Sequence, residues 1–224
     1  SKSQQIAKAI GLSSPAHESK LCLKCHSANA LSMPPSDKVR LSEGVSCEVC
    51  HGPASNWIGP HLSHNWRAQP KSVKSQSGLR DLSSPRERVE TCIKCHVGTP
   101  GFEVTHEMIA AGHPRMLFEM TAFLAAMPQH WDEAKTRRRV PQFTAKVWLI
   151  GQTATLRRTI DNMAARSSDQ ILPEFADNDC YACHRSLSGR TTEKSFGANS
   201  RTWGRWPVEL TLLADRQPYA SMLR

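Results

Sequence analysis

The sequence predicts a mainly α-helical fold with extensive loops. A short pattern, Cys-x-x-Cys-His, occurs four times in the 224 residues and accounts for all eight cysteines. Apolar residues recur at helical spacing in two long stretches, while much of the remaining chain is rich in Ser, Pro, Gly and Asn. The copies of the pattern lie at unequal intervals, unlike a repeat array, so we expect one domain over residues 1–224.

The elements expected before the third motif are short or irregular. Residues 1–26 predict a helical arm that leads to the first motif. Residues 27–90 show little helical or strand periodicity and predict a loop wrapped around the groups that the motifs bind. The segment after His184 is again polar and glycine-rich, with Trp203 and Trp206 as expected packing anchors.

Two longer helices are expected in the second half of the chain. Apolar spacing predicts one helix over residues 104–127, kinked or divided at Gly112 and Pro114. It predicts another from about Phe143 to Arg166. The buried stripe expected on this second helix consists of Val147, Ile150, Ala154, Leu156, Ile160 and Met163.

The repeated pattern is suited to covalent attachment of haem. Two thiols three positions apart can reach the two vinyl groups of one porphyrin, and the next residue brings an imidazole to the iron. The four motifs cover residues 22–26, 47–51, 92–96 and 180–184. The attaching thiols are Cys22, Cys25, Cys47, Cys50, Cys92, Cys95, Cys180 and Cys183, and the proximal ligands are His26, His51, His96 and His184. We therefore predict four covalently bound haem c groups that organise a multihaem cytochrome c fold.

Three other uses of eight cysteines explain the sequence less well. A disulfide framework needs no histidine after every second cysteine. Two zinc ribbons would leave the same four histidines unexplained. A thioredoxin-like redox motif occurs near a strand–helix pattern that this sequence lacks.

The second axial ligand of each iron must come from outside the motifs, and histidine is the residue type expected for electron-transfer haems. Four histidines are the main candidates: His17, His61, His106 and His113. On a continuous helix His106 and His113 would share one face and could reach two neighbouring haems. His64 and His130 are weaker candidates, because surface positions or contacts with propionates explain them equally well.

Charge and compartment limit the class of partner. The formal net charge of +9 would fall to about +5 with four oxidised haems, so much of the basic excess can balance propionates. Nucleic acid is not expected as a partner. Lys135, Arg137, Arg138 and Arg139 form a basic run that suits a solvated loop, propionates or an acidic redox partner. Because c-type haem is attached outside the cytoplasm, we expect a periplasmic or extracellular protein.

With these motifs in place, the chain resembles the tetrahaem cytochrome c-554 family and related multihaem cytochromes. The resemblance lies in Gly44-Val45-Ser46-Cys47-Glu48-Val49-Cys50-His51-Gly52-Pro53, followed by His61, and in the segment from Met108 to Phe118. The resemblance implies a mostly helical, loop-rich fold with haems in close pairs, and electron transfer in nitrogen metabolism. It also implies that His61 is the distal ligand of a haem other than the one attached to the second motif.

The sequence thus predicts an electron carrier that works between donor and acceptor proteins through mainly bis-histidine haems. One of these partners could be associated with a membrane. Two alternatives stay open: a multihaem oxidoreductase that acts on a small nitrogen compound at a five-coordinate haem, and a subunit of a conducting filament. The sequence does not determine the oligomeric state.

Overall fold

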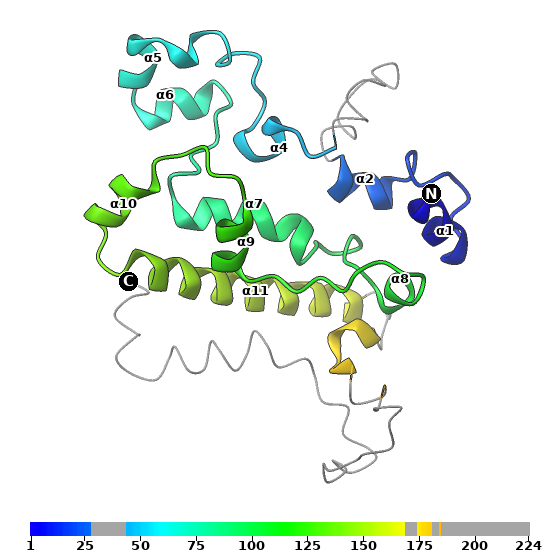
Figure 1. The fold of residues 1–224 in the computed structure, drawn as a ribbon. Coiled ribbons are helices and arrows are strands. Elements are labelled where there is room, and N and C mark those ends of the chain that lie inside the picture. The colour runs from blue at the N-terminus through cyan, green and yellow to red at the C-terminus, as the bar shows by residue number, and fades with distance from the viewer. Residues whose placement is uncertain (28–43, 169–173, 181–183, 185–224) are drawn as a thin grey trace. The chain divides into compact units, whose positions relative to one another are not determined.

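The computed structural model describes residues 1–27, 44–168, 174–180 and 184 (Figure 1). Within these ranges the regular structure is helical and contains no β-strand, which confirms the mainly α class. No helix in the described part of the chain combines the length and apolar character needed to cross a membrane. The chain groups into two compact units, Ser1–His96 and Val97–Arg224. The single domain expected from the sequence stays a prediction.

Short helices make up the described part of the first unit. Two of them confirm the helical arm, and α2 packs against α7. The elements are α1 (Lys2–Ala9), α2 (Lys20–His26), α4 (Cys47–His51), η2 (Pro60–Leu62), α5 (His64–Ala68), α6 (Lys71–Gln76) and α7 (Pro85–His96).

The loop expected over residues 27–90 was wrong for the described part of that range. Residues 28–43 lie outside the described residues, but four helices and a 3₁₀ turn occur between 44 and 96. Four of these five elements have three to six residues, too few to produce a visible apolar period. Local signals mark the start of two of the five elements: the Ser63 hydroxyl accepts a hydrogen bond from the Trp66 N–H at the start of α5, and Pro85 opens α7.

The second unit is built on one long helix. The described elements are α8 (His106–Ala110), α9 (Met120–Ala126), α10 (Glu133–Arg139), α11 (Phe143–Ser168) and η3 (Phe175–Asp177). The helix α11 packs against α9 and α10, and α8 packs against η3 (Figure 1). The expected helix over 104–127 is therefore divided, into α8 and α9. Pro114 cannot continue the helix, and the His113 N–H closes α8 on the Met108 carbonyl at 2.9 Å.

The helix expected from Phe143 to Arg166 is confirmed, but its predicted buried stripe is partly wrong. Val147 is buried as expected, whereas Ile160 is 50% exposed. The remaining predicted positions are intermediate in exposure. Four polar residues are buried on α11 instead: Gln152, Thr155, Asn162 and Arg166. An apolar pattern cannot reveal such a face, because each of these positions appears in the sequence as a break in the stripe.

Gly151 controls how closely α9 approaches α11. A Cβ atom at this position would lie 2.7 Å from Cβ of Met120, which is itself buried. Because that neighbour is the first atom of a side chain and is fixed to the backbone, the two helices would have to separate to accept a larger residue.

Replacing Gly151 with valine should therefore lower the free energy of unfolding by about 2 kcal/mol, the usual scale for overpacking. Ala164, which is exposed on the same helix, provides the matched control. Ala164→Val should cost at most about 0.7 kcal/mol, through helix propensity alone. Denaturant unfolding of both holoproteins measures the difference, and equal losses would contradict the close packing.

Candidate haem-binding sites

The first three motifs share one local geometry. The helices α2, α4 and α7 each end on the histidine of a motif, at His26, His51 and His96 respectively. In a helix, residues i, i+3 and i+4 lie on the same side, so both thiols and the imidazole of each motif face one direction. This arrangement fits a porphyrin attached through two edges and ligated from one face.

The fourth motif keeps the same backbone turn in its described part. The His184 N–H donates to the Cys180 carbonyl at 2.7 Å, which is the i→i−4 bond of one helical turn. Cys183 lies outside the described residues. Among the seven described cysteines, none forms a disulfide.

Three motifs meet in the first unit. The thiols of Cys25 and Cys95 share a hydrogen bond, which raises the pKa of Cys25 and lowers the pKa of Cys95 to about 7. Cys50 is close enough to both Cys92 and Cys95 to influence their electrostatics. Groups attached to these thiols would therefore be close neighbours.

Burial around the third motif favours neutral ligating groups. Burial raises the pKa of the Cys92 thiol to about 11 and lowers the pKa of the His96 imidazole. A neutral imidazole carries the lone pair that an iron requires. The protonation state of His96 thus suits its expected role as a proximal ligand.

Two backbone segments approach each other closely at the carboxyl end of the second motif. Gly52 has φ +82°, and a Cβ atom on it would collide with the carbonyl oxygen of Gly78. Only glycine permits this approach, which explains the residue that follows His51. Beside this close approach, the Arg80 N–H donates to the His51 carbonyl at 2.8 Å.

The Arg80 side chain completes this end of α4. Its Nη1 donates to the carbonyl oxygens of Val49 at 2.8 Å and Cys50 at 2.9 Å. These carbonyls have no partner within so short a helix, and a cation also suits the negative end of the helix dipole. Arg80 therefore fixes the turn that carries the second pair of thiols.

His61 lies beside the second motif. Trp57 is 7% exposed, and its ring lies 6.5 Å from that of His51 and 6.1 Å from that of His61. The Nδ1 atom of His61 contacts the carbonyl oxygen of Ile58. An Nδ1–H donor directed at a carbonyl leaves the lone pair on Nε2, the arrangement typical of metal-ligating histidines.

His113 has the same arrangement as His61, with Nδ1 2.8 Å from the Pro114 carbonyl oxygen. It does not share a helical face with His106, because α8 ends at Ala110. The expectation of one continuous helix that carries both histidines is thus wrong. The weaker candidates His64 and His130 are both exposed, and Nδ1 of His130 lies 3.2 Å from the Pro128 carbonyl oxygen.

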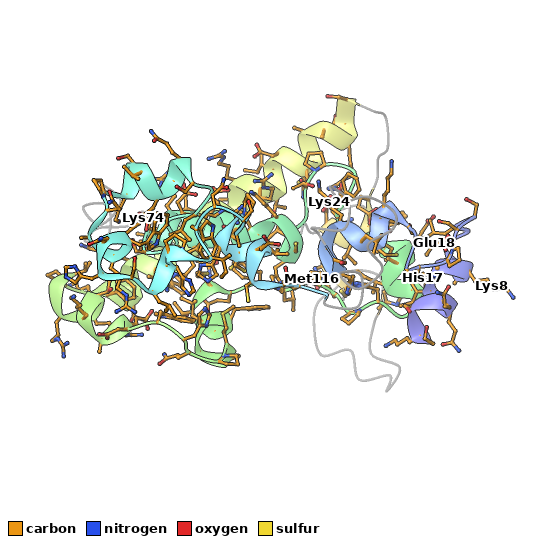
Figure 2. All side chains as sticks on the ribbon, turned by 90° about the horizontal axis from the view of Figure 1, so that it is seen from above. Lys8, His17, Glu18, Lys24, Lys74 and Met116 are labelled. Atoms are coloured by element: carbon orange, nitrogen blue, oxygen red, sulfur yellow. The ribbon has the colours of Figure 1, made fainter. Side chains whose placement is uncertain are left out.

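His17 lies at the surface of the segment between α1 and α2. Its side chain is 66% exposed and lies next to that of Glu18, with 3.5 Å between Nε2 and Oε1 (Figure 2). Its Nδ1 is 3.3 Å from Nε2 of Gln4. These polar contacts orient the His17 ring, and neither of them involves a motif histidine.

In the second unit, His106 faces the motif histidine His184. Their ring centroids are 6.1 Å apart, and their planes are inclined by 27°. An iron bound by two imidazoles, each at about 2 Å, separates the ring centroids by about 6 Å. The two side chains therefore fit opposite sides of one haem iron.

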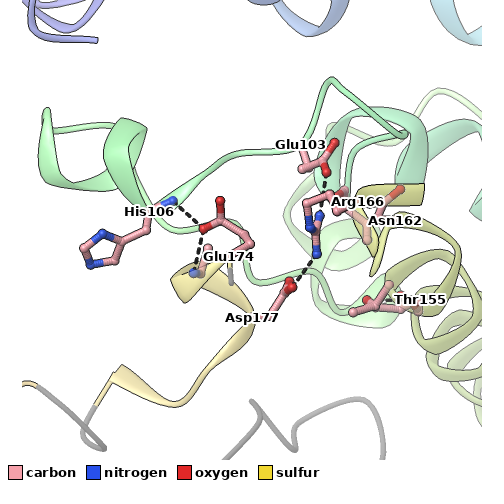
Figure 3. A network of polar contacts seen from close by, with 10 residues as sticks. Glu103, His106, Thr155, Asn162, Arg166, Glu174 and Asp177 are labelled. Atoms are coloured by element: carbon pink, nitrogen blue, oxygen red, sulfur yellow. Dashed lines mark hydrogen bonds and ion pairs between the residues drawn. The ribbon is translucent and has the colours of Figure 1, made fainter. Parts of the chain in front are cut away.

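A buried arginine lies behind this pair. Arg166 of α11 makes ion pairs with Glu103, at 2.5 Å, and with Asp177 (Figure 3). Burial disfavours a charge on the guanidinium, but hydrogen bonds and charge from Glu103 and Asp177 raise the pKa of Arg166. Arg115 contributes a further contact, since its Nη1 lies 2.7 Å from Sγ of Cys180.

The sequence indicated the ligands but not the residues that hold them. Arg80, Arg115 and Arg166 contact the motifs or the segments beside them, yet none belongs to a recognisable pattern. Of these three arginines, Arg166 has one feature visible in the sequence. It follows Asn162 by four residues, which places two polar residues on one face of α11.

The basic run on α10 is partly used inside the second unit. Arg137 donates to Glu133 at 2.9 Å, and its guanidinium carbon lies 5.6 Å from the centre of the Phe143 ring. The run is helical, which corrects the expected loop. Lys135 and Arg138 are exposed, so they are the described members of the run that remain available to a partner.

A family model described as cytochrome c554 and c-prime matches residues 1–52, which include the first two motifs. No curated protein and no solved structure matches the chain.

Replacing Arg80 with glutamine should remove the charged donor from the carboxyl end of α4. We expect the free energy of unfolding of the holoprotein to fall by about 1–2 kcal/mol, the scale of a hydrogen bond from a charged group. Arg67→Gln is the matched control, because Arg67 is exposed. If denaturant unfolding gives the same value for both variants, Arg80 does not fix the second motif.

Proposed function

We propose a function for the chain from the match of residues 1–52 to the cytochrome c554 and c-prime family model, which supports the resemblance noted around Gly44–Pro53. The chain is an exported tetrahaem c-type cytochrome that passes electrons between redox partner proteins. The family is one of c-type cytochromes, which carry covalently bound haem c and transfer electrons. The number of four haems rests on the four motifs.

The observation that carries the proposal is the pairing of His106 with His184. A ring separation of 6.1 Å leaves room for an iron with an imidazole on each side. His106 and His184 would hold an iron between them, which would leave it no open position for a substrate while it changes oxidation state. This favours a carrier over an enzyme for the fourth haem.

The remaining distal ligands are proposed from residue type and orientation. His61 and His113 each direct Nδ1 to a backbone carbonyl, which leaves Nε2 to act as the ligand. His17 is proposed as a third. The proximal ligands His26, His51 and His96 lie at the ends of their helices, where the motif geometry favours ligation from one face.

The chain's own residues control where the electron resides. When bound, haem supplies an iron that changes between the ferric and ferrous states. The buried Trp57 ring lies beside His51 and His61 and contributes apolar surface to their neighbourhood. The hydrogen bond between Cys25 and Cys95 and the electrostatic influence of Cys50 on Cys92 favour close spacing of three attachment sites. No side chain in this mechanism needs to move a proton or bind a substrate.

The proposed surroundings follow from the same chemistry. Haem c is attached outside the cytoplasm, so the proposed location is periplasmic or extracellular. The proposed partners are a donor and an acceptor protein, with no role for nucleic acid. Lys135 and Arg138 on α10 are candidates for contact with an acidic partner.

Replacing His106 with alanine should convert one of the four haems from low-spin to high-spin. The reason is that His184 would then ligate the iron alone. Electron paramagnetic resonance of the oxidised protein measures the change, with haem content checked by pyridine haemochrome.

His64→Ala is the matched control, because His64 is an exposed histidine at the start of α5. It should leave every signal unchanged. A wild-type protein with a high-spin haem that binds nitric oxide, nitrite or hydroxylamine would overturn the pure carrier and favour the oxidoreductase. An unchanged spectrum in His106→Ala would overturn the ligand pairing.

A further inference from the structure

The described helix that carries His106 and the 3₁₀ turn that precedes the fourth motif are both short. The helix α8 has five residues and η3 has three. Helices of this length are not stable by themselves, because too few hydrogen bonds form per residue fixed. The separation of the two imidazoles must therefore be set by contacts with the rest of the second unit.

Arg166 supplies such a contact to both segments at once. Its Nη1 donates to Glu103, three residues before His106, and its Nη2 donates to Asp177, three residues before Cys180. The side chain is 8% exposed, and those of Glu103 and Asp177 are 10% and 19% exposed. Water therefore competes weakly for these ion pairs.

Glu174 joins the two segments directly. Its Oε1 accepts a hydrogen bond from the His106 N–H at 2.8 Å and from the Ala176 N–H at 2.8 Å (Figure 3). The Phe175 ring also meets the His106 ring edge-on, with 5.8 Å between centroids. The ligand segments thus form one body, which Arg166 attaches to α11.

We propose that Arg166 is a positioning residue for the haem held by His106 and His184: its guanidinium fixes both ligand-bearing segments to α11 and so sets the distance between the imidazoles. This inference rests on the proposed function. Arginine suits the role because its planar fork can donate to two carboxylates in different directions, whereas a lysine ammonium is a single compact charge.

The test compares Arg166→Gln with Arg157→Gln. Arg157 is on the same helix and is paired with Asp161 at 3.8 Å, but its side chain is 68% exposed. Both variants lose one positive charge from α11. Only the first should loosen the axial ligands.

Loss of a supporting partner lowers the affinity of a metal-ligand set by about 10- to 100-fold. We therefore expect carbon monoxide to bind one haem of the reduced Arg166→Gln protein about 10-fold more tightly than in wild type. The low-spin signal that His106→Ala abolishes should also split or broaden. The other three haems and the Arg157→Gln protein should behave as wild type.

If Arg166→Gln yields no holoprotein, Glu103→Gln and Asp177→Asn each remove one half of the contact, and each should give a smaller increase in carbon monoxide binding at the same haem. Arg166→Lys should restore part of the wild-type behaviour. Unchanged carbon monoxide binding and spectra in the variants that fold, beside a wild type with four low-spin haems, would overturn the positioning role alone. A high-spin haem in wild type that His106→Ala does not alter would instead overturn the proposed ligand pair.

Discussion

One geometric constraint governs this molecule: a single helical turn must present two thiols and an imidazole on the same side. The helices α2, α4 and α7 meet the constraint by ending on the motif histidine. The motif therefore fixes the residue at which each of these helices ends. Short helices of this kind have little stability in isolation, so contacts elsewhere in the chain must hold them. The close approach of Gly52 to Gly78 and the Arg80 side chain show how the second motif is held.

The same constraint explains what could be predicted from the sequence. The spacing of cysteine and histidine is local chemistry, so it predicts the attachment sites and proximal ligands directly. The helix α11 was also predictable, since its 26 residues contain enough turns to show a period. The short helices between residues 44 and 96 were missed because three to six residues are too few to show a period.

The distal ligands show where sequence reasoning ends. Residue type makes histidine the candidate, but the proposed pairing of His106 with His184 depends on contacts between segments far apart in the chain. The prediction that His106 and His113 share one helical face was wrong because α8 ends at Ala110. The prediction of the buried face of α11 was wrong for a different reason. Arg166 is buried with two carboxylate partners, and a hydrophobicity pattern counts it as exposed.

These polar contacts change the meaning of the basic excess. A net charge of +9 first suggested counter-charges for propionates or a surface for an acidic partner. Yet Arg80 binds backbone carbonyls, Arg137 binds Glu133, and Arg166 joins two carboxylates. Each of these guanidiniums holds the chain together, and the last two are already neutralised by acidic side chains. Because the covalent groups fix only the motifs, the chain needs such directional donors to place the segments between them. Part of the positive charge is therefore structural, and the surface available to a partner is smaller than the composition implies.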